Sequence, residues 1–199
     1  MKKKSYDFYS EDLIVVVPDG LRIGRNNRPY LTNTYRKVLK RASLESKNFN
    51  LKILLLPANN FGTKKSEELV GKEYLLRQGV KENMIIIGLK NKKSYLDTLD
   101  NFNQVILNEG SINNKKFNVS SYLKQGKFKL ITSYLHSKRI LNVISLLNLE
   151  MPKEIICIFS KESGRIPFRL IYYKYPLLHF LYEIIAIIYQ NFKIYIMKF

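Results

Sequence analysis

The sequence lacks the residue patterns of several common classes of enzyme. It contains one cysteine and two histidines, and it has no HxxxH, CxxC or clustered aspartates of the kind that bind metal ions. It also has no GxSxG, Walker or GxGxxG motif, so a serine hydrolase, a P-loop NTPase and an ordinary dinucleotide dehydrogenase are disfavoured. The single Cys157 lies in an apolar run, which excludes a disulfide framework within the chain and favours a buried strand residue. We predict no metal site, and the sequence leaves the identity of any cofactor unknown.

Acidic residues are also scarce. The chain has 16 Asp and Glu against 34 Lys and Arg, which gives a formal net charge of +18 and a pI near 9.8. Such a charge suits nucleic acid or an anionic membrane surface. The basic residues are dispersed, however, and no RNP-type aromatic motif, zinc spacing or basic helical stripe accompanies them. We interpret most of them as a solvated surface, and we keep a basic binding module for nucleic acid or anionic membrane as the alternative function.

Long apolar runs are absent except near the C-terminus. Met1–Ser5 carries three lysines, and Tyr6–Asp12 is polar and acidic rather than a signal-type apolar segment. We therefore expect a cytoplasmic, reducing location. The stretch LLHFLYEIIAIIYQNF, which follows Pro176 in the C-terminal segment 176–199, is apolar almost all round. It is shorter than the roughly 20 apolar residues of a membrane span, and it contains His179 and Glu183. We predict a helix packed on the domain, with peripheral membrane association as an alternative.

Apolar strand-like runs alternate with segments of helical periodicity. The expected strands are Leu13–Val17, Leu51–Leu56, Met84–Ile87, Phe128–Ile131 and Ile155–Phe159. Each is followed by a polar loop, which is typical of a parallel sheet covered by helices on both faces. The 199 residues therefore predict one α/β domain, a three-layer Rossmann-like fold with a mostly parallel sheet of about five strands. Residues 1–12 form a polar extension, and residues 109–127 form an irregular connection.

The stretch KLITSYLHSKR, Lys129–Arg139, is the turn between the fourth expected strand and its helix. Ser133, His136 and Arg139 follow the strand directly, where open parallel sheets bind their ligands. Arginine offers a planar fork to phosphate or carboxylate, and histidine can transfer a proton near neutral pH. We assign Arg139 to anion binding and His136 to proton transfer, and we expect both at an open edge with few core contacts.

Polar residues follow the other expected strands as well, and parallel strands bring all these turns to one edge of the sheet. Glu67 is the expected carboxylate partner of His136, although its place in a first helical turn is explained equally well by the helix dipole. The neutral side chains suit sugar, ribose or phosphate oxygens. The full expected ligand-binding set is Asp19, Gly20, Arg36, Asn59, Asn60, Thr98, Asn101, Ser133 and Arg139.

These motifs, taken in order, resemble those of the ElyC/SanA/YdcF family of bacterial α/β proteins. The matching elements are the R-x-x-R-P-Y-L loop that leads to Arg36, Asn59-Asn60, Ser66-Glu67, QGVKENMII, T-L-D-N from Thr98, and T-S-x-x-H-x-x-R from Thr132. The match runs from about Leu13 to Phe159. The resemblance implies a YdcF-like fold, a site at the sheet edge and a link to the cell envelope.

The chain departs from the family pattern at three places. The glycine-rich first turn is reduced to Pro18-Asp19-Gly20, PANN replaces the usual Ser-Gly-Gly or Ser-Gly-Asp, and Asn91-Lys92-Lys93 replaces an acidic residue. The expected ligand is therefore stated by class: a small anionic or phosphate-bearing molecule, such as a nucleotide or an envelope precursor. Neither a specific reaction nor an oligomeric state follows from the sequence.

Overall fold

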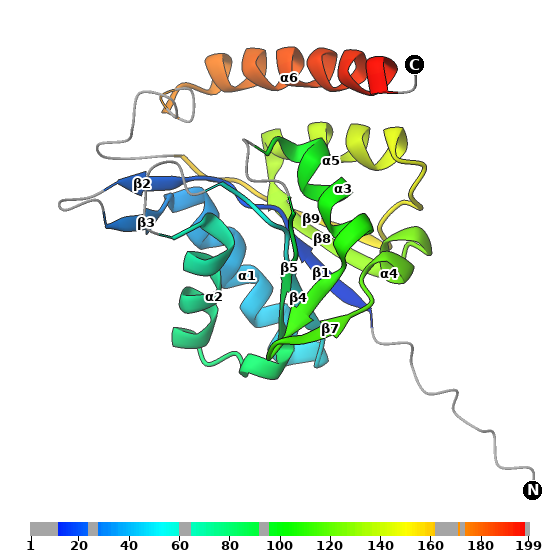
Figure 1. The fold of residues 1–199 in the computed structure, drawn as a ribbon. Coiled ribbons are helices and arrows are strands. Elements are labelled where there is room, and N and C mark those ends of the chain that lie inside the picture. The colour runs from blue at the N-terminus through cyan, green and yellow to red at the C-terminus, as the bar shows by residue number, and fades with distance from the viewer. Residues whose placement is uncertain are drawn as a thin grey trace, which may run out of the picture.

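The computed structural model describes residues 12–23, 28–59, 65–91, 96–161, 171 and 174–197. Its centre is a parallel sheet with the order β5-β4-β1-β8-β9 (Figure 1). The strands are β1 (Leu13–Val16), β4 (Lys52–Leu55), β5 (Ile85–Gly88), β8 (Phe128–Ser133) and β9 (Glu154–Ile158). The predicted Rossmann-like α/β fold and its five parallel strands are confirmed.

Two further strands extend the sheet beyond β5, so the mixed sheet has seven strands. They are β6 (Gly110–Ile112) and β7 (Lys115–Phe117), and both run antiparallel to their neighbours. The prediction of an irregular connection over 109–127 was therefore wrong. Asn113 and Asn114 both have positive φ, 49° and 64°, which is the requirement of a two-residue hairpin turn. A short helix, α4 (Ser120–Lys124), follows.

A second, two-stranded sheet lies in the first polar loop. It pairs β2 (Leu21–Ile23) with β3 (Pro29–Leu31) in antiparallel fashion. The remaining helices are α1 (Asn33–Phe49), α2 (Glu67–Arg77), the 3-10 turn η2 (Glu82–Met84), α3 (Thr98–Asn108), α5 (Tyr134–Leu146) and α6 (Pro176–Met197).

The alternating side chains of β1 supply both layers of the core. Leu13, Val15 and Val17 pack with α3, α4 and α5 on one face of the sheet. Ile14 and Val16 pack with α1 and α2 on the other face. All five side chains are at most 1% exposed. This continuous apolar run is what a strand buried on both faces requires.

The C-terminal helix α6 forms an outer layer against α5 (Figure 1). Its main packing partner is α5 rather than the sheet. The helix lies over α5 and the start of α3, where Lys193 reaches Asp97 and Asp100. None of the helices within the described ranges has the length and apolar character needed to cross a membrane.

The chain order of the strands creates a crevice at one place. From β1 the chain moves outward through β4 to β5, and it then returns to the other side of β1 to form β8 and β9. Loops on either side of such a reversal leave in opposite directions and open a space outside the carboxyl ends of the two strands. Residues that follow β1 and β8 should therefore line this space.

We expect Gly110→Ala to destabilise the domain by about 1–3 kcal/mol, because a Cβ there overpacks the core. It would lie 2.4 Å from Ile86 Cγ2 and 2.8 Å from Val119 Cγ2, and both of these side chains are fully buried. Urea unfolding of the variant measures the loss. Ser111→Ala, at the next position of β6, is the control, and equal stability of the two variants would contradict the packing.

Candidate functional site

The turn after β1 connects three segments of the chain. Asp19 is 2% exposed, and its carbonyl oxygen accepts a hydrogen bond from Thr32 Oγ1 at 2.8 Å. Gly20 has a φ of 94°, which glycine adopts without strain. Its N–H donates to Glu67 Oε2 at 3.0 Å. The structure thus brings together Asp19, Gly20 and Glu67, as the sequence predicted for the carboxyl edge of the sheet.

His136 lies between this turn and the start of α3. Its Nε2 is 3.3 Å from Thr98 Oγ1, and its Nδ1 is 3.8 Å from Asp19 Oδ1. The separation of 3.8 Å from Asp19 is too long for a hydrogen bond, and Nδ1 is buried without a hydrogen-bond partner among the described residues. Nε2 and the Thr98 hydroxyl lie within hydrogen-bond distance of each other, and the tautomer decides which of the two donates. The carboxylate near His136 is therefore that of Asp19, and not that of Glu67 as the sequence predicted. Glu67 instead accepts a hydrogen bond from the Gly20 N–H.

The imidazole of His136 is neutral near pH 7. Burial lowers its pKa well below the ordinary value, and the charges of Arg139 and His179 lower it further. A neutral imidazole that keeps an acceptor nitrogen is a proton acceptor.

Three buried carboxylates, those of Asp19, Glu67 and Glu68, form an acidic group beside this turn. Glu68 Oε2 accepts from the Ala58 N–H at 3.1 Å, and its Oε1 accepts from Ser66 Oγ at 2.6 Å and lies 3.4 Å from Lys90 Nζ. Glu68 thus fixes the turn after β4, a role that the sequence did not suggest. The only feature of the sequence that could have indicated this role is the position of Glu68 directly after Glu67.

Tyr35 of α1 points toward the same acidic group. Burial raises the pKa of its hydroxyl well above the ordinary value, and Glu67, Glu68 and Asp19 raise it further. The hydroxyl has no hydrogen-bond partner among the described residues. A Cβ on Gly71 would lie 2.8 Å from it, so a glycine at that position leaves room for the hydroxyl.

Two predicted binding residues hold loops in place. The Asn59 side chain accepts from the Leu96 N–H at 2.8 Å and donates to its carbonyl at 2.7 Å. The Asn101 amide, oriented so that its nitrogen donates, reaches the carbonyls of Pro57 at 2.9 Å and Asp97 at 3.0 Å. Both amides join the turn after β4 to the start of α3.

One other predicted residue, Arg36, lies apart from this arrangement. Arg36 is exposed, and it donates to Asn33 on its own helix at 3.2 Å. Asn60 lies outside the described residues.

Arg139 is paired with a residue of α6. Its Nε lies 2.8 Å from Glu183 Oε2, and its guanidinium lies over the Tyr182 ring at 5.3 Å from the centroid. His179, one helical turn before Glu183, places Nε2 3.3 Å from Glu183 Oε1. The site predicted from the sequence lacked these α6 residues. The feature that could have indicated them is the i, i+4 spacing of His179 and Glu183 in an otherwise apolar stretch.

The expectation of an open edge was wrong. His136 is 3% exposed and Arg139 is 7% exposed. The physical reason is α6, which packs on α5 and covers its first turns. The sequence showed an apolar C-terminal helix but did not show where that helix would pack.

A pocket of about 300 Å³ lies at the carboxyl ends of β8 and β9, and its lining includes Thr34, Ser133, Tyr134, Ile158, Ser160 and His179. α5 begins directly after β8, with Ser133 at the N-cap but no capping bond from its side chain. Ser133 Oγ is buried without a hydrogen-bond partner among the described residues. Among those residues no group of three or more His, Cys, Asp or Glu side chains is arranged to hold a metal ion.

We expect His136→Gln to remove a pH dependence of stability. A histidine whose pKa is lowered by folding contributes stability above its unfolded pKa of about 6.5. That stability is lost as the pH falls from there toward the folded pKa, at about 1.4 kcal/mol per pH unit. Denaturant unfolding between pH 7.5 and 5, a range of about 2.5 units around the unfolded pKa, measures it in parent and variant. Parallel curves would show that His136 does not titrate in this way.

We expect Glu183→Gln to destabilise the protein by about 3–5 kcal/mol, because it leaves a buried guanidinium without its counter-ion. The exposed pair of Glu73 on α2 with Lys65, just before that helix, gives the matched control, Glu73→Gln, with an expected loss of about 0–1 kcal/mol. The double variant Arg139→Met/Glu183→Leu should recover much of the loss. Thermal unfolding of all three variants checks the pair, and similar losses for the two Glu→Gln variants would contradict it.

Comparison with known proteins leaves the family assignment as a prediction. No protein-family model, no curated protein and no solved structure was found to match the chain. The resemblance to the ElyC/SanA/YdcF family therefore rests on the sequence motifs, and the function has to be argued from the fold and the site geometry described above.

Proposed function

We propose that this protein binds a small phosphate-bearing or otherwise anionic ligand in the pocket at the start of α5, and that His136 transfers a proton to or from it. The observation that carries the proposal is the buried Ser133 hydroxyl, which lines the pocket at the N-cap of α5 and has no hydrogen-bond partner among the described residues. A ligand oxygen would satisfy that hydroxyl.

Two helix N-termini meet at the pocket. Thr34 belongs to the first turn of α1, and Tyr134 and Leu135 belong to the first turn of α5. These two first turns, both fully described, contain no acidic side chain. In contrast, α2 and α3 carry acidic residues in theirs. The partial positive charge and the unpaired N–H groups at the start of a helix favour an anion, so an anionic group is the best supported occupant.

The neighbouring charges refine the ligand class. Arg139 already holds a carboxylate, Glu183, so a ligand anion that reached this guanidinium would compete with an internal one. The acidic group of Asp19, Glu67 and Glu68 lies near the turn after β1 and repels a second anionic centre there. A ligand with one phosphate at α5 and a neutral, hydroxyl-rich part toward Asp19 and His136 fits both conditions. Nucleotides and envelope precursors, which the family resemblance suggests, contain such groups.

The proton-transfer role rests on the His136 environment. The Asp19 carboxylate lies 3.8 Å from Nδ1, and the lowered pKa keeps the ring neutral. Thr98 Oγ1 lies at Nε2, where a hydroxyl of the ligand could replace it. A neutral imidazole can accept a proton as a general base. The cytoplasmic location and the cell-envelope link stay predictions from the sequence.

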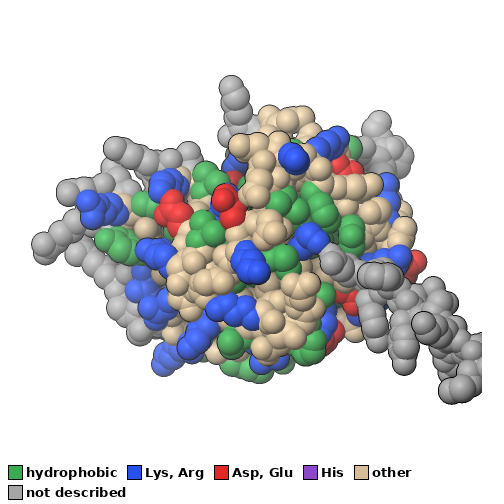
Figure 2. All heavy atoms as spheres, turned by 90° about the horizontal axis from the view of Figure 1, so that it is seen from below, with side chains coloured by type: hydrophobic (Ala, Val, Ile, Leu, Met, Phe, Trp, Pro, Cys, Tyr) green, Lys and Arg blue, Asp and Glu red, His purple; other side chains and the backbone are tan. Residues whose placement is uncertain are grey.

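The alternative of a nucleic-acid module gains less support from the surface. Figure 2, the face turned away from α6, shows Lys and Arg side chains interspersed with hydrophobic and acidic ones. A nucleic-acid interface requires a continuous basic track along the phosphate backbone.

The test is a binding screen with Ser133→Ala. Parent protein should be stabilised in thermal-shift assays by nucleoside monophosphates or sugar phosphates, and calorimetry then gives the affinity. Loss of a hydrogen bond to a charged ligand group should weaken binding by about tenfold to a hundredfold. The melting temperature of the free variant should stay near that of the parent, because Ser133 makes no capping bond.

Ser137→Ala is the matched control on the same helix. The Ser137 hydroxyl donates to the Tyr134 carbonyl at 2.6 Å and does not line the pocket. It should leave ligand affinity unchanged. If no phosphate compound binds, or if Ser133→Ala binds as tightly as the parent, the pocket is not a phosphate site.

A further inference from the structure

The C-terminal helix α6 is oriented with polar side chains toward the protein and apolar side chains toward the solvent. Its buried residues include His179, Glu183 and Gln190, which are 6%, 4% and 1% exposed. On the opposite side Ile185, Ile188 and Phe192 are 65%, 64% and 62% exposed. A helix on the surface of a water-soluble domain shows the reverse pattern. The medium or partner that covers α6 should therefore be apolar.

Ion pairs at both halves of the helix fix this orientation. Glu183 is paired with Arg139 of α5 at 2.8 Å, and Lys193 is 2.8 Å from both Asp97 and Asp100 at the N-terminus of α3. A rotation of α6 that buried its apolar side would break all three contacts and leave Arg139 buried without its counter-ion. The apolar side is thus held outward.

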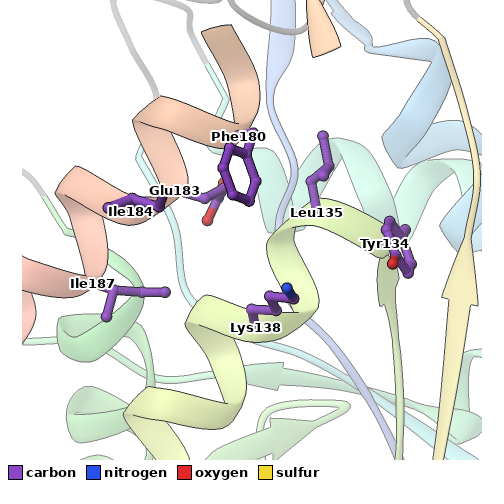
Figure 3. Close-up of a pocket in the computed structure, with 7 residues that line it drawn as sticks. All are labelled: Tyr134, Leu135, Lys138, Phe180, Glu183, Ile184 and Ile187. Atoms are coloured by element: carbon purple, nitrogen blue, oxygen red, sulfur yellow. The ribbon is translucent and has the colours of Figure 1, made fainter. Parts of the chain in front are cut away.

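We call the exposed side chains from Leu177 to Ile196 the outer face of α6. Among the described side chains of this helix, the exposed ones are apolar or aromatic except Asn191, and none is charged. A groove of about 230 Å³ between α5 and α6 continues this surface inward (Figure 3), lined mainly by apolar side chains that include Leu135, Phe180 and Ile187. An apolar surface of this extent marks an interaction site.

We propose that the outer face of α6 docks on the surface of an anionic lipid bilayer, with the helix lying in the plane of the interface. The charge of the chain selects this occupant: a net charge of +18 is attracted to anionic headgroups over roughly a Debye length of 10 Å. Three lysines lie on neighbouring segments. Lys138 is exposed on α5, Lys161 is exposed shortly after β9, and Lys174 lies two residues before α6. No exposed acidic side chain among the described residues of α6 opposes this approach.

A second copy of the chain fits the outer face less well. Two copies that each carry a charge of +18 repel one another, whereas anionic lipid neutralises that charge. The aromatic side chains also suit the interface, where the polar tip of tyrosine meets the headgroups and its ring meets the acyl chains. Tyr189 and Tyr195, 54% and 61% exposed, occupy such positions on the outer face.

The first experiment is vesicle flotation. Parent protein is mixed with vesicles of phosphatidylcholine, or of phosphatidylcholine with an equal part of phosphatidylglycerol, and we expect flotation with the anionic vesicles. The triple variant Ile185→Gln/Ile188→Gln/Phe192→Gln should lower the partition coefficient by roughly a hundredfold or more, since interfacial binding scales with buried apolar area. All three side chains face solvent, so the variant should fold.

A matched variant keeps the number of apolar-to-polar changes constant. Leu44→Gln/Leu76→Gln/Leu107→Gln changes three exposed leucines on other helices, 48%, 39% and 74% exposed, and it should float like the parent. Equal flotation of the α6 variant and the parent would overturn the proposal. So would a parent that binds neither kind of vesicle.

The second experiment uses the absence of tryptophan from the sequence. Ile188→Trp places a single fluorophore on the outer face, and Leu107→Trp places one on α3. Anionic vesicles should shift the emission of the first variant to shorter wavelength, and brominated lipid should quench it, with neither effect in the second. Sedimentation without lipid tests the rival occupant: a parent dimer that the α6 triple variant dissociates, without a fluorescence shift on vesicles, would assign the face to a second copy.

Discussion

The constraint on which the rest of the structure depends is the complete burial of β1 between two parallel neighbours. β1 pairs with β4 on one side and β8 on the other, and its side chains feed the two core layers alternately. A strand enclosed in this way must be apolar at every position, and each buried side chain of this size contributes about 1.5–3 kcal/mol. Because β1 and β8 run in the same direction, their following turns emerge together at the point where the strand order reverses.

The contact of His136 with Asp19 and Thr98 follows from that arrangement. More than a hundred residues separate Asp19 from His136 in the chain, yet the two strands before them are neighbours in the sheet. The direct passage from β8 into α5 leaves no loop between Ser133 and Tyr134, so the helix N-terminus is held at the sheet edge. Packing of the apolar sheet thus sets the geometry of the polar site.

The pairing of Arg139 with Glu183 adds a second level of control. It holds α6 over the first turns of α5, which buries the site residues and turns the apolar side of α6 outward. One buried ion pair therefore links the environment of His136 to the surface of the C-terminal helix. Any event at the outer face that moved α6 would also change the burial of His136 and the distance between Arg139 and its counter-ion Glu183.

Local patterns were sufficient for the central fold. Five apolar runs, each followed by a polar turn, predicted the parallel sheet, because period and composition decide between strand and helix where the signal is strong. The short hairpin of β6 and β7 was missed, since the three-residue strands GSI and KKF carry little apolar signal, and β6 depends on pairing with β5.

For the site, the sequence by itself determined which side chains follow which strands, and the parallel sheet then fixed their common edge. Asp19, Gly20, Glu67, Thr98 and His136 come together for that reason. Only the tertiary structure decided which side chains lie next to each other. Asp19 rather than Glu67 lies near His136. Asn59 and Asn101 hold loops, and Glu183 forms an ion pair with Arg139. The physical reason is that strand order and helix packing act over the whole chain, whereas a sequence pattern reports on the few residues around it.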